Sequence, residues 1–166
     1  IRRILVPDGL MLAAFAGAGS LPRLRSALRA AEEAQGEAPS PRIHPQIDVR
    51  AAGDLLMRAG FALPVVDSDP VRVRYSGLFP LIRDLRAMAA TNILSRRSRR
   101  PISREGLAAA AADFAANADP DGKTEERFEI LHLSGWSPSA DQPRPARRGS
   151  ATASLADALS RDDRRS

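Results

Sequence analysis

Two short, uninterrupted apolar runs constrain the fold of this chain more than any other feature. They occupy residues 10–15 (LMLAAF) and 61–66 (FALPVV). A run of this length without polar alternation is typical of a strand buried on both faces, as in a parallel sheet. Amphipathic helical patterns lie between and after the two runs. The sequence therefore predicts an α/β fold with a largely parallel sheet.

Turn and capping residues set the expected helix boundaries. A short helix over residues 1–5 is expected to end at Pro7-Asp8-Gly9. A second helix is expected to begin after Ser20, which is a suitable N-cap. A third lies between the N-cap Asp48 and the C′ glycine Gly60. The remaining two cover residues 78–88 and the stretch that follows Ser103.

The second half of the chain adds two strands to the expected sheet. Residues 71–75 alternate valine and tyrosine with arginine, which predicts a half-exposed strand, and Ser68-Asp69-Pro70 is expected to separate it from the run at 61–66. A turn at residues 119–122 (DPDG) precedes a last strand over 128–133. Three core strands are few for a doubly wound sheet, so we expect further strands upstream of Ile1.

The chain is basic, but its net charge does not identify a partner. The 166 residues include 24 arginines and one lysine, Lys123, and the bland explanation is a GC-rich coding genome. The run from Arg96 to Arg100 is the densest basic patch, and it is compatible with nucleic acid, with an acidic protein or carrier, or with a solvated loop. The single Trp and single Tyr do not interleave with it, so the sequence does not favour nucleic acid.

Several kinds of chemistry are absent from the sequence. The chain has no cysteine, which excludes disulfides and thiol catalysis. His44 and His132 are the only histidines and have no carboxylate at ligand spacing, so no metal site is expected. No apolar stretch is long enough for a membrane helix. No nucleophile, base and acid set is visible, and we assign no catalytic residue.

Candidate site residues lie at the ends of the expected strands. Gly17 and Gly19 follow the first strand like the opening of a dinucleotide fingerprint, but Pro22 stands where the third glycine belongs. A flexible crossover at the carboxyl end of a strand is the alternative, and ligands bind at that edge of open α/β sheets. Tyr75 and Asn92 flank the helix at 78–88, where each could face a substrate or be structural.

Three segments resemble one protein family. The opening IRRILVPDGLMLA resembles the approach to the fifth strand of class I S-adenosylmethionine-dependent methyltransferases. The stretch from Tyr75 to Asn92 (YSGLFPLIRDLRAMAATN) is similar to the lid-like helix of malonyl-carrier-protein methyltransferases of biotin synthesis. It resembles still more the methyltransferase-fold assembly factor of respiratory complex I, as do Gly135-Trp136 and the segment at 144–152 (RPARRGSAT).

This resemblance implies the C-terminal half of a Rossmann-like methyltransferase sheet ordered 3-2-1-4-5-7-6. Residues 10–15, 61–66 and 128–133 would be strands five, six and an antiparallel seven. Residues 1–136 would form that half, with a lid-like helical insert at about 76–118, and residues 137–166 a Pro/Arg-rich linker and weakly ordered tail. The glycine-rich cofactor loop would lie upstream, so no residue here is assigned to S-adenosylmethionine. The substrate-side candidates are Gly17, Gly19, Tyr75 and Asn92.

The implied function is that of an S-adenosylmethionine-dependent methyltransferase whose acceptor side this chain supplies. The acceptor would be a protein or a carrier-bound substrate, and the location cytoplasmic, or the mitochondrial matrix in a eukaryote. A non-methylating complex I assembly factor that hydroxylates a partner arginine is the first alternative, and a small nucleic-acid-binding module the second. The chain alone is expected to be inactive, and poorly soluble or molten, because a sheet cut at strand five has an open edge.

Overall fold

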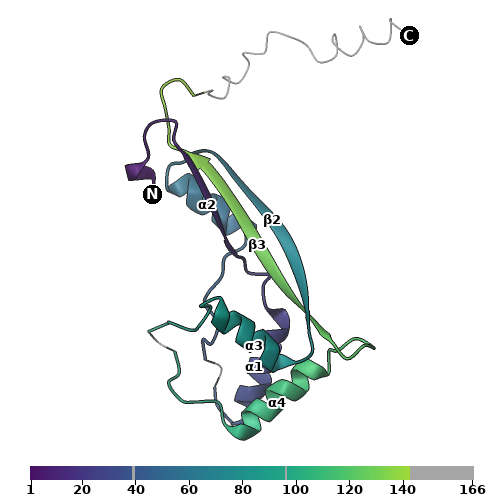
Figure 1. Ribbon diagram of the computed structural model, residues 1–166. Helices are drawn as coiled ribbons and strands as arrows, with labels where there is room; N and C mark the ends of the chain where they lie inside the picture. The colour runs from purple at the N-terminus through teal and green to yellow at the C-terminus, as the bar shows by residue number, and fades with distance from the viewer. Residues whose placement is uncertain (39, 96, 143–166) are drawn as a thin grey trace, which may run out of the picture.

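The computed structural model describes residues 1–38, 40–95 and 97–142, and these form a three-stranded sheet with helices at both ends (Figure 1). The strands are β1 (Leu10–Ala16), β2 (Ala62–Tyr75) and β3 (Thr124–Trp136), in the order β1-β3-β2. Strand β3 runs antiparallel to both neighbours. This is the 5-7-6 arrangement that the family resemblance implies, so the expected fold class is confirmed.

The largely parallel sheet predicted from the apolar runs alone is wrong for the described residues. Strands β1 and β2 point the same way, but β3 lies between them and both pairings are antiparallel. The expected burial of both faces is also wrong for the described residues, because β1 and β2 are the outer strands and expose Leu12 and Val65. An apolar run does not specify strand direction, since apolar strands occur in both kinds of sheet.

Strand β2 is one long strand and not the two that the sequence predicted. Its pairing with β3 continues through Ser68, Asp69 and Pro70, and Pro70 lies opposite Glu129. Among the described strands β2 pairs only with β3, and an edge strand tolerates proline because the missing N–H need not bond to a second neighbour. The irregularity lies earlier, between Ala62 and Val65, where the register shifts.

The helices largely follow the sequence signals. They are α1 (Pro22–Ala34), α2 (Val49–Arg58), α3 (Leu78–Ala87) and α4 (Arg104–Ala115). Asp48 and Ser103 accept hydrogen bonds from the first turns of α2 and α4, as expected of N-caps. Gly60 follows α2 with a φ of +78°, as expected of a C′ glycine. The expected helix at the start of the chain is only a 3₁₀ turn, η1 (Arg2–Ile4).

The expected N-cap of α1 is wrong. Ser20 is buried, and its hydroxyl pairs with the backbone of Glu129 on β3. The cap residue is Leu21, whose side chain has no acceptor atom, and a carboxylate from β3 takes its place. Glu126 accepts hydrogen bonds from the N–H groups of Arg23 and Leu24, at 3.2 and 2.8 Å. The side chain that caps this helix therefore comes from a strand about a hundred residues away.

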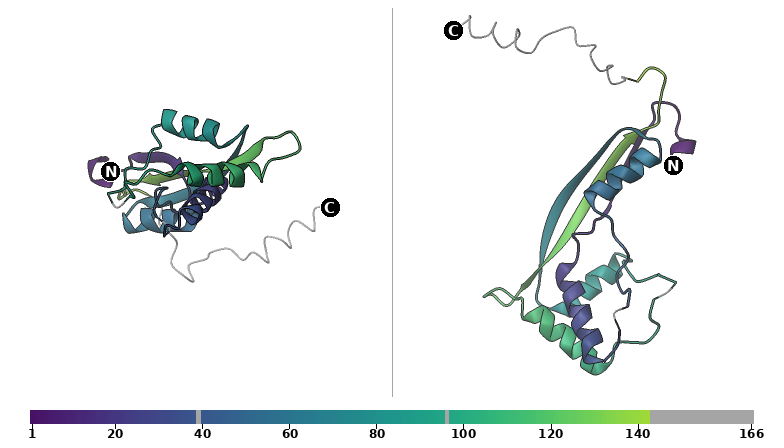
Figure 2. Two further views of the ribbon diagram at one scale, coloured as in Figure 1. Left: turned by 90° about the horizontal axis from the view of Figure 1, so that it is seen from below. Right: turned by 180° about the vertical axis from the view of Figure 1, so that it is seen from behind.

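Two apolar cores lie on opposite faces of the sheet, one beneath α2 and one among α1, α3 and α4, and Figure 2 shows these two groups of helices near opposite ends of the sheet. On one face, Ala52 and Leu56 of α2 pack against the β3 residues Leu131 and Leu133. On the other face, α1, α3 and α4 enclose Tyr75, and the fully buried Phe114 of α4 lies in the same cluster. Each helix group thus covers only part of the sheet and leaves the remainder open.

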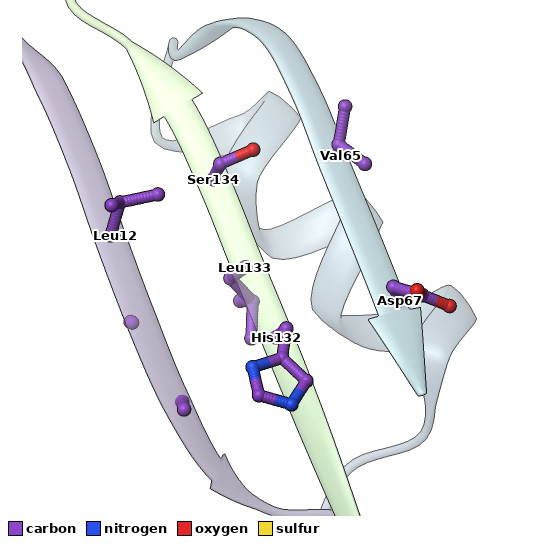
Figure 3. Close-up of a pocket in the computed structure, with 8 residues that line it drawn as sticks. Leu12, Val65, Asp67, His132, Leu133 and Ser134 are labelled. Carbon is purple, nitrogen blue, oxygen red and sulfur yellow. The ribbon is translucent and has the colours of Figure 1, made fainter. Parts of the chain in front are cut away.

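The uncovered part of the sheet carries both apolar and polar side chains (Figure 3). Its residues, here called the bare face, share the side of the sheet opposite α2 and are Leu12, Ala14, Val65, Asp67, His132 and Ser134. Leu12 and Val65 are 74% and 59% exposed, although they sit in strands. The outer edge of β1 pairs with no strand among the described residues.

The open edge and the bare face bear on the expected poor solubility, which stays a prediction. The isolated chain is expected to self-associate, because an unpaired apolar strand is a template for pairing with other chains. Light scattering after size-exclusion chromatography measures this directly. A monomer with sharp, cooperative melting would contradict the prediction and mean that the domain boundary lies elsewhere.

None of the helices in the described part of the chain has the length and apolar character needed to span a membrane.

Candidate functional site

A hollow of about 690 Å³ lies where α1, α3 and two loops meet the end of the sheet, and we call it the loop hollow. Its volume is within the range of small-molecule sites. Most of its wall is aliphatic or aromatic. These apolar side chains are Leu21, Leu24, Leu28, Ile43, Ile82, Leu85, Met88, Ile102, Phe128 and Ile130.

The position of the loop hollow follows from the sheet topology. Ala16 ends β1 and lines the hollow together with its cross-strand partner Ile130. The hollow therefore lies at the carboxyl end of β1, which is the edge where open α/β sheets bind ligands. On the same face of β3, His132 follows Ile130 and belongs to the bare face. The bare face therefore leads along the sheet into the loop hollow.

Asn92 holds the rim of the loop hollow together. Its Nδ2 donates to the carbonyl of Pro41 at 2.8 Å, and its Oδ1 accepts from the N–H of Leu94 at 3.1 Å. The neighbouring N–H of Ile93 lies 3.4 Å from Nε2 of His44, which accepts this hydrogen bond. Asn92 thus joins the loop after α1 to the loop after α3, and it lines the hollow that they enclose.

A buried carboxylate fixes the first of these loops to α1. Glu32 is only 4% exposed and accepts from the backbone N–H of Ser40 at 3.1 Å and from its hydroxyl at 2.8 Å. Arg42 Nε donates to the same oxygen of Glu32 at 2.9 Å. Burial raises the pKa of Glu32, but the hydrogen bonds from Ser40 and Arg42 outweigh it and lower the pKa below 4.5.

Replacing Glu32 by glutamine is expected to lower the free energy of unfolding by about 1–2 kcal/mol at neutral pH, because the amide forms weaker hydrogen bonds with Ser40 and Arg42. The lowered folded-state pKa has a further consequence. The carboxylate contributes its stability above pH 4.5, and this contribution is lost as the pH falls from there through the folded-state pKa. Urea unfolding at stepped pH measures both effects. If the wild-type protein and the Glu32→Gln variant differed in stability by the same amount across that window, this assignment would be contradicted.

Tyr75 lies in a smaller neighbouring hollow of about 430 Å³. Val73, Asp84 and Met88 also line it, and it shares Met88, Phe128 and Ile130 with the loop hollow. Burial and the negative charge of Asp84 raise the pKa of the Tyr75 phenol, so the phenol remains protonated at neutral pH. Tyr75 is therefore a buried donor beside the loop hollow and does not line it.

Gly17 and Gly19 lie so close to side chains of β3 that an added Cβ would force those side chains to move. The N–H of Gly19 donates to the carboxylate of Glu129 at 2.7 Å, and a Cβ at Gly19 would lie 2.5 Å from the guanidinium of Arg127. A Cβ at Gly17 would lie 2.8 Å from Leu131. Glu129 thus accepts the N–H that a phosphate would use, and its charge would repel that phosphate.

Two arginines of the basic run at residues 96–100 already have partners within the protein. Arg97 Nη1 donates to the carbonyl of Leu94 at 3.1 Å, and Arg100 lies 3.7 Å from Glu37. Arg96 lies outside the described residues, as does the segment 143–166 that carries part of the family resemblance.

Glu126 and Glu129 were not predicted from the sequence as neighbours of the crossover after β1. The N–H groups that they accept lie about a hundred residues away in the chain.

Other polar groups do not form a recognisable site. Asp67 of β2 lies opposite His132 of β3 in the strand register, on the bare face, and both side chains are exposed. Within residues 1–38, 40–95 and 97–142, no three of the histidine and acidic side chains come close enough to hold a metal ion.

The chain is similar in sequence to two groups of named enzymes. The mitochondrial arginine-hydroxylase NDUFAF5 of Danio rerio is 37% identical over 158 residues, which are 95% of this chain and 49% of that protein. The human protein of the same name is 38% identical over 93% of the chain and 45% of its own length. A malonyl-[acyl-carrier protein] O-methyltransferase of Xylella fastidiosa is 33% identical over 84% of the chain and 45% of its length.

The resemblance inferred from the sequence is confirmed. Both groups of relatives named there are found, and the order β1-β3-β2 agrees with the strand arrangement that they imply. The chain spans about half the length of these relatives. No family model matches the chain. The relatives are enzymes by name, a hydroxylase and a methyltransferase, so the reaction of this chain is a separate question.

Proposed function

We propose that this chain forms the acceptor side of an S-adenosylmethionine-dependent, methyltransferase-like enzyme. The observation that carries the proposal is the loop hollow at the carboxyl end of β1, in a sheet ordered β1-β3-β2. Methyl transfer asks the protein to hold an acceptor close to a sulfonium and in line with it, and an apolar hollow with a fixed rim suits that task. Residues 1–136 would form this half, with the segment 76–118 as its lid.

The cofactor would be held chiefly by a part of the enzyme that this chain does not span, as the half-length match to the relatives suggests. The open edge of β1 and the bare face are the surfaces available for that part. S-adenosylmethionine would supply the electrophilic methyl group when bound. Asn92 and Tyr75 would shape the acceptor side, and Gly17 and Gly19 would let the crossover after β1 approach β3 closely.

The proposal is tested with the longer protein that contains this chain and S-adenosylmethionine labelled in its methyl group. The protein is added to an extract of cells lacking it, and we expect label to pass to one component. Replacing Ile82 by tryptophan should narrow the hollow beside α3 and reduce transfer at least tenfold. Transfer that is unaffected by this change would remove the loop hollow from the mechanism, and absence of any transfer would reject methylation.

A second candidate is a non-methylating assembly factor that hydroxylates an arginine of a partner protein. It is favoured by the similarity to the arginine-hydroxylases, which extends over 93–95% of the chain in the two cases above. Affinity capture of the longer protein followed by mass spectrometry separates the two candidates. A captured protein that gains one oxygen on an arginine supports hydroxylation, whereas a gained methyl group supports the first proposal. Location in the cytoplasm, or in the mitochondrial matrix of a eukaryote, suits both.

A further inference from the structure

The lining of the loop hollow selects for a ligand of particular chemistry. Its apolar walls come from opposite sides, with Leu24 and Leu28 on α1 and Ile82 and Leu85 on α3. Phe128 and the neighbouring sheet residues form the floor. A flexible aliphatic chain would replace water against all these surfaces, whereas a short polar acid would leave them wet.

The charged side chains that line the loop hollow are all arginines. No aspartate or glutamate lies among its lining residues as described, whereas Arg42 and Arg97 both do. Arg42 is already paired with Glu32. Arg97 makes no ion pair with a carboxylate in the described part of the chain and donates to the Leu94 carbonyl through Nη1. Among the residues that the structure describes, Arg97 is therefore a cation at the rim without a counter-ion.

We propose that the loop hollow binds an aliphatic monocarboxylate, with its hydrocarbon chain between α1 and α3 and its carboxylate at Arg97. A bidentate pairing with the guanidinium would fix the carboxylate at the rim. A cationic ligand, such as an arginine or lysine side chain, would enter a lining with two guanidiniums and no carboxylate to neutralise it. That this ligand is also the methyl acceptor rests on the proposed function, whereas its chemical class rests on the hollow alone.

Calorimetric titration of decanoate, decylamine, decanol and malonate into the longer protein that contains this chain tests the ligand class. Decanoate should bind at one site, at least tenfold more tightly than decylamine or malonate. Replacing Arg97 by glutamine should weaken decanoate about tenfold and leave decanol unchanged, because only the charge-assisted hydrogen bonds are lost. The same replacement at Arg99, which is exposed on the same loop but outside the lining, should change neither the decanoate nor the decanol affinity.

The outcomes separate this inference from the proposed function. Decylamine binding as tightly as decanoate, or an Arg97→Gln protein with unchanged decanoate affinity, would overturn the ligand class. Ile82→Trp should abolish decanoate binding, and retained affinity in that variant would place the ligand outside the hollow. If decanoate binds as expected but the longer protein transfers no methyl group to it, the ligand class stands and its role as acceptor fails.

Discussion

Replacing Glu126 by alanine is expected to lower the free energy of unfolding by about 3 kcal/mol, because a buried carboxylate that caps a helix is lost. Glu126 is fully buried. Besides the N–H groups of Arg23 and Leu24, it accepts the N–H of Arg127 at 3.0 Å. The alanine variant would leave these three donors without their acceptor, with the N–H of Leu24 buried and the other two partly buried. A negative charge at this position also interacts favourably with the dipole of α1.

The measurement is urea unfolding followed by fluorescence of Trp136, the only tryptophan. If the isolated chain associates, the longer protein serves instead. Glu125→Ala is the matched control, because Glu125 is exposed and its pairing with Arg72 at 3.7 Å is a surface ion pair. It should change stability by less than about 0.5 kcal/mol. A Glu126 variant as stable as this control would mean that α1 is capped by other groups.

Replacing Gly106 by alanine is expected to destabilise the protein by about 2 kcal/mol, although alanine is the better helix former. Gly106 lies in the first turn of α4, where this helix packs against α1. A Cβ there would lie 2.9 Å from the backbone oxygen of Ala31 and 2.6 Å from Oε1 of Gln35. The Gln35 side chain can move aside, but the Ala31 carbonyl belongs to α1, so the two helices would have to separate.

Gly53 offers an opposite control within the same chain. It lies in α2, and a Cβ there would meet nothing within 4 Å. Gly53→Ala should therefore stabilise the protein by up to about 1 kcal/mol, as helix propensity alone predicts. The same substitution is thus expected to change stability with opposite signs at these two helical glycines. A stabilising Gly106→Ala would show that α1 and α4 are less closely packed than described.

The local sequence predicted helix ends well where the capping group is close in the chain. Asp48 and Ser103 each accept from an N–H three residues ahead, so their capping role depends only on short-range geometry. The start of α1 was predicted wrongly because its acceptor, Glu126, is supplied by β3. Nothing in the neighbourhood of Ser20 indicates that its hydroxyl would be taken up by Glu129 instead.

The strands show the same division. The strand character of β1 and β2 could be read from their apolar runs. Neither their exposed face nor the antiparallel strand between them could, since strand direction depends on the path of the whole chain. The continuity of β2 through Ser68-Asp69-Pro70 was missed because its pairing with β3 outweighs local turn propensity. The resemblance to known proteins supplied the strand order that periodicity left open.

The candidate site residues were predicted individually, and the structure gives them different environments. Asn92 lines the loop hollow and Tyr75 a neighbouring one. Gly17 and Gly19 pack against Glu129 and Leu131. The hollow itself joins segments near residues 43, 85, 97 and 128, and no spacing rule along the sequence brings those segments together.

Calorimetric titration with S-adenosylmethionine tests the central claim most directly, because the claim is that this chain is the acceptor side of an enzyme whose cofactor is held elsewhere. The titration is performed on the longer protein and on the present chain. We expect saturable binding at one site by the longer protein and no measurable heat from the chain alone. Absence of binding by the longer protein, or tight binding by this chain alone, would contradict it.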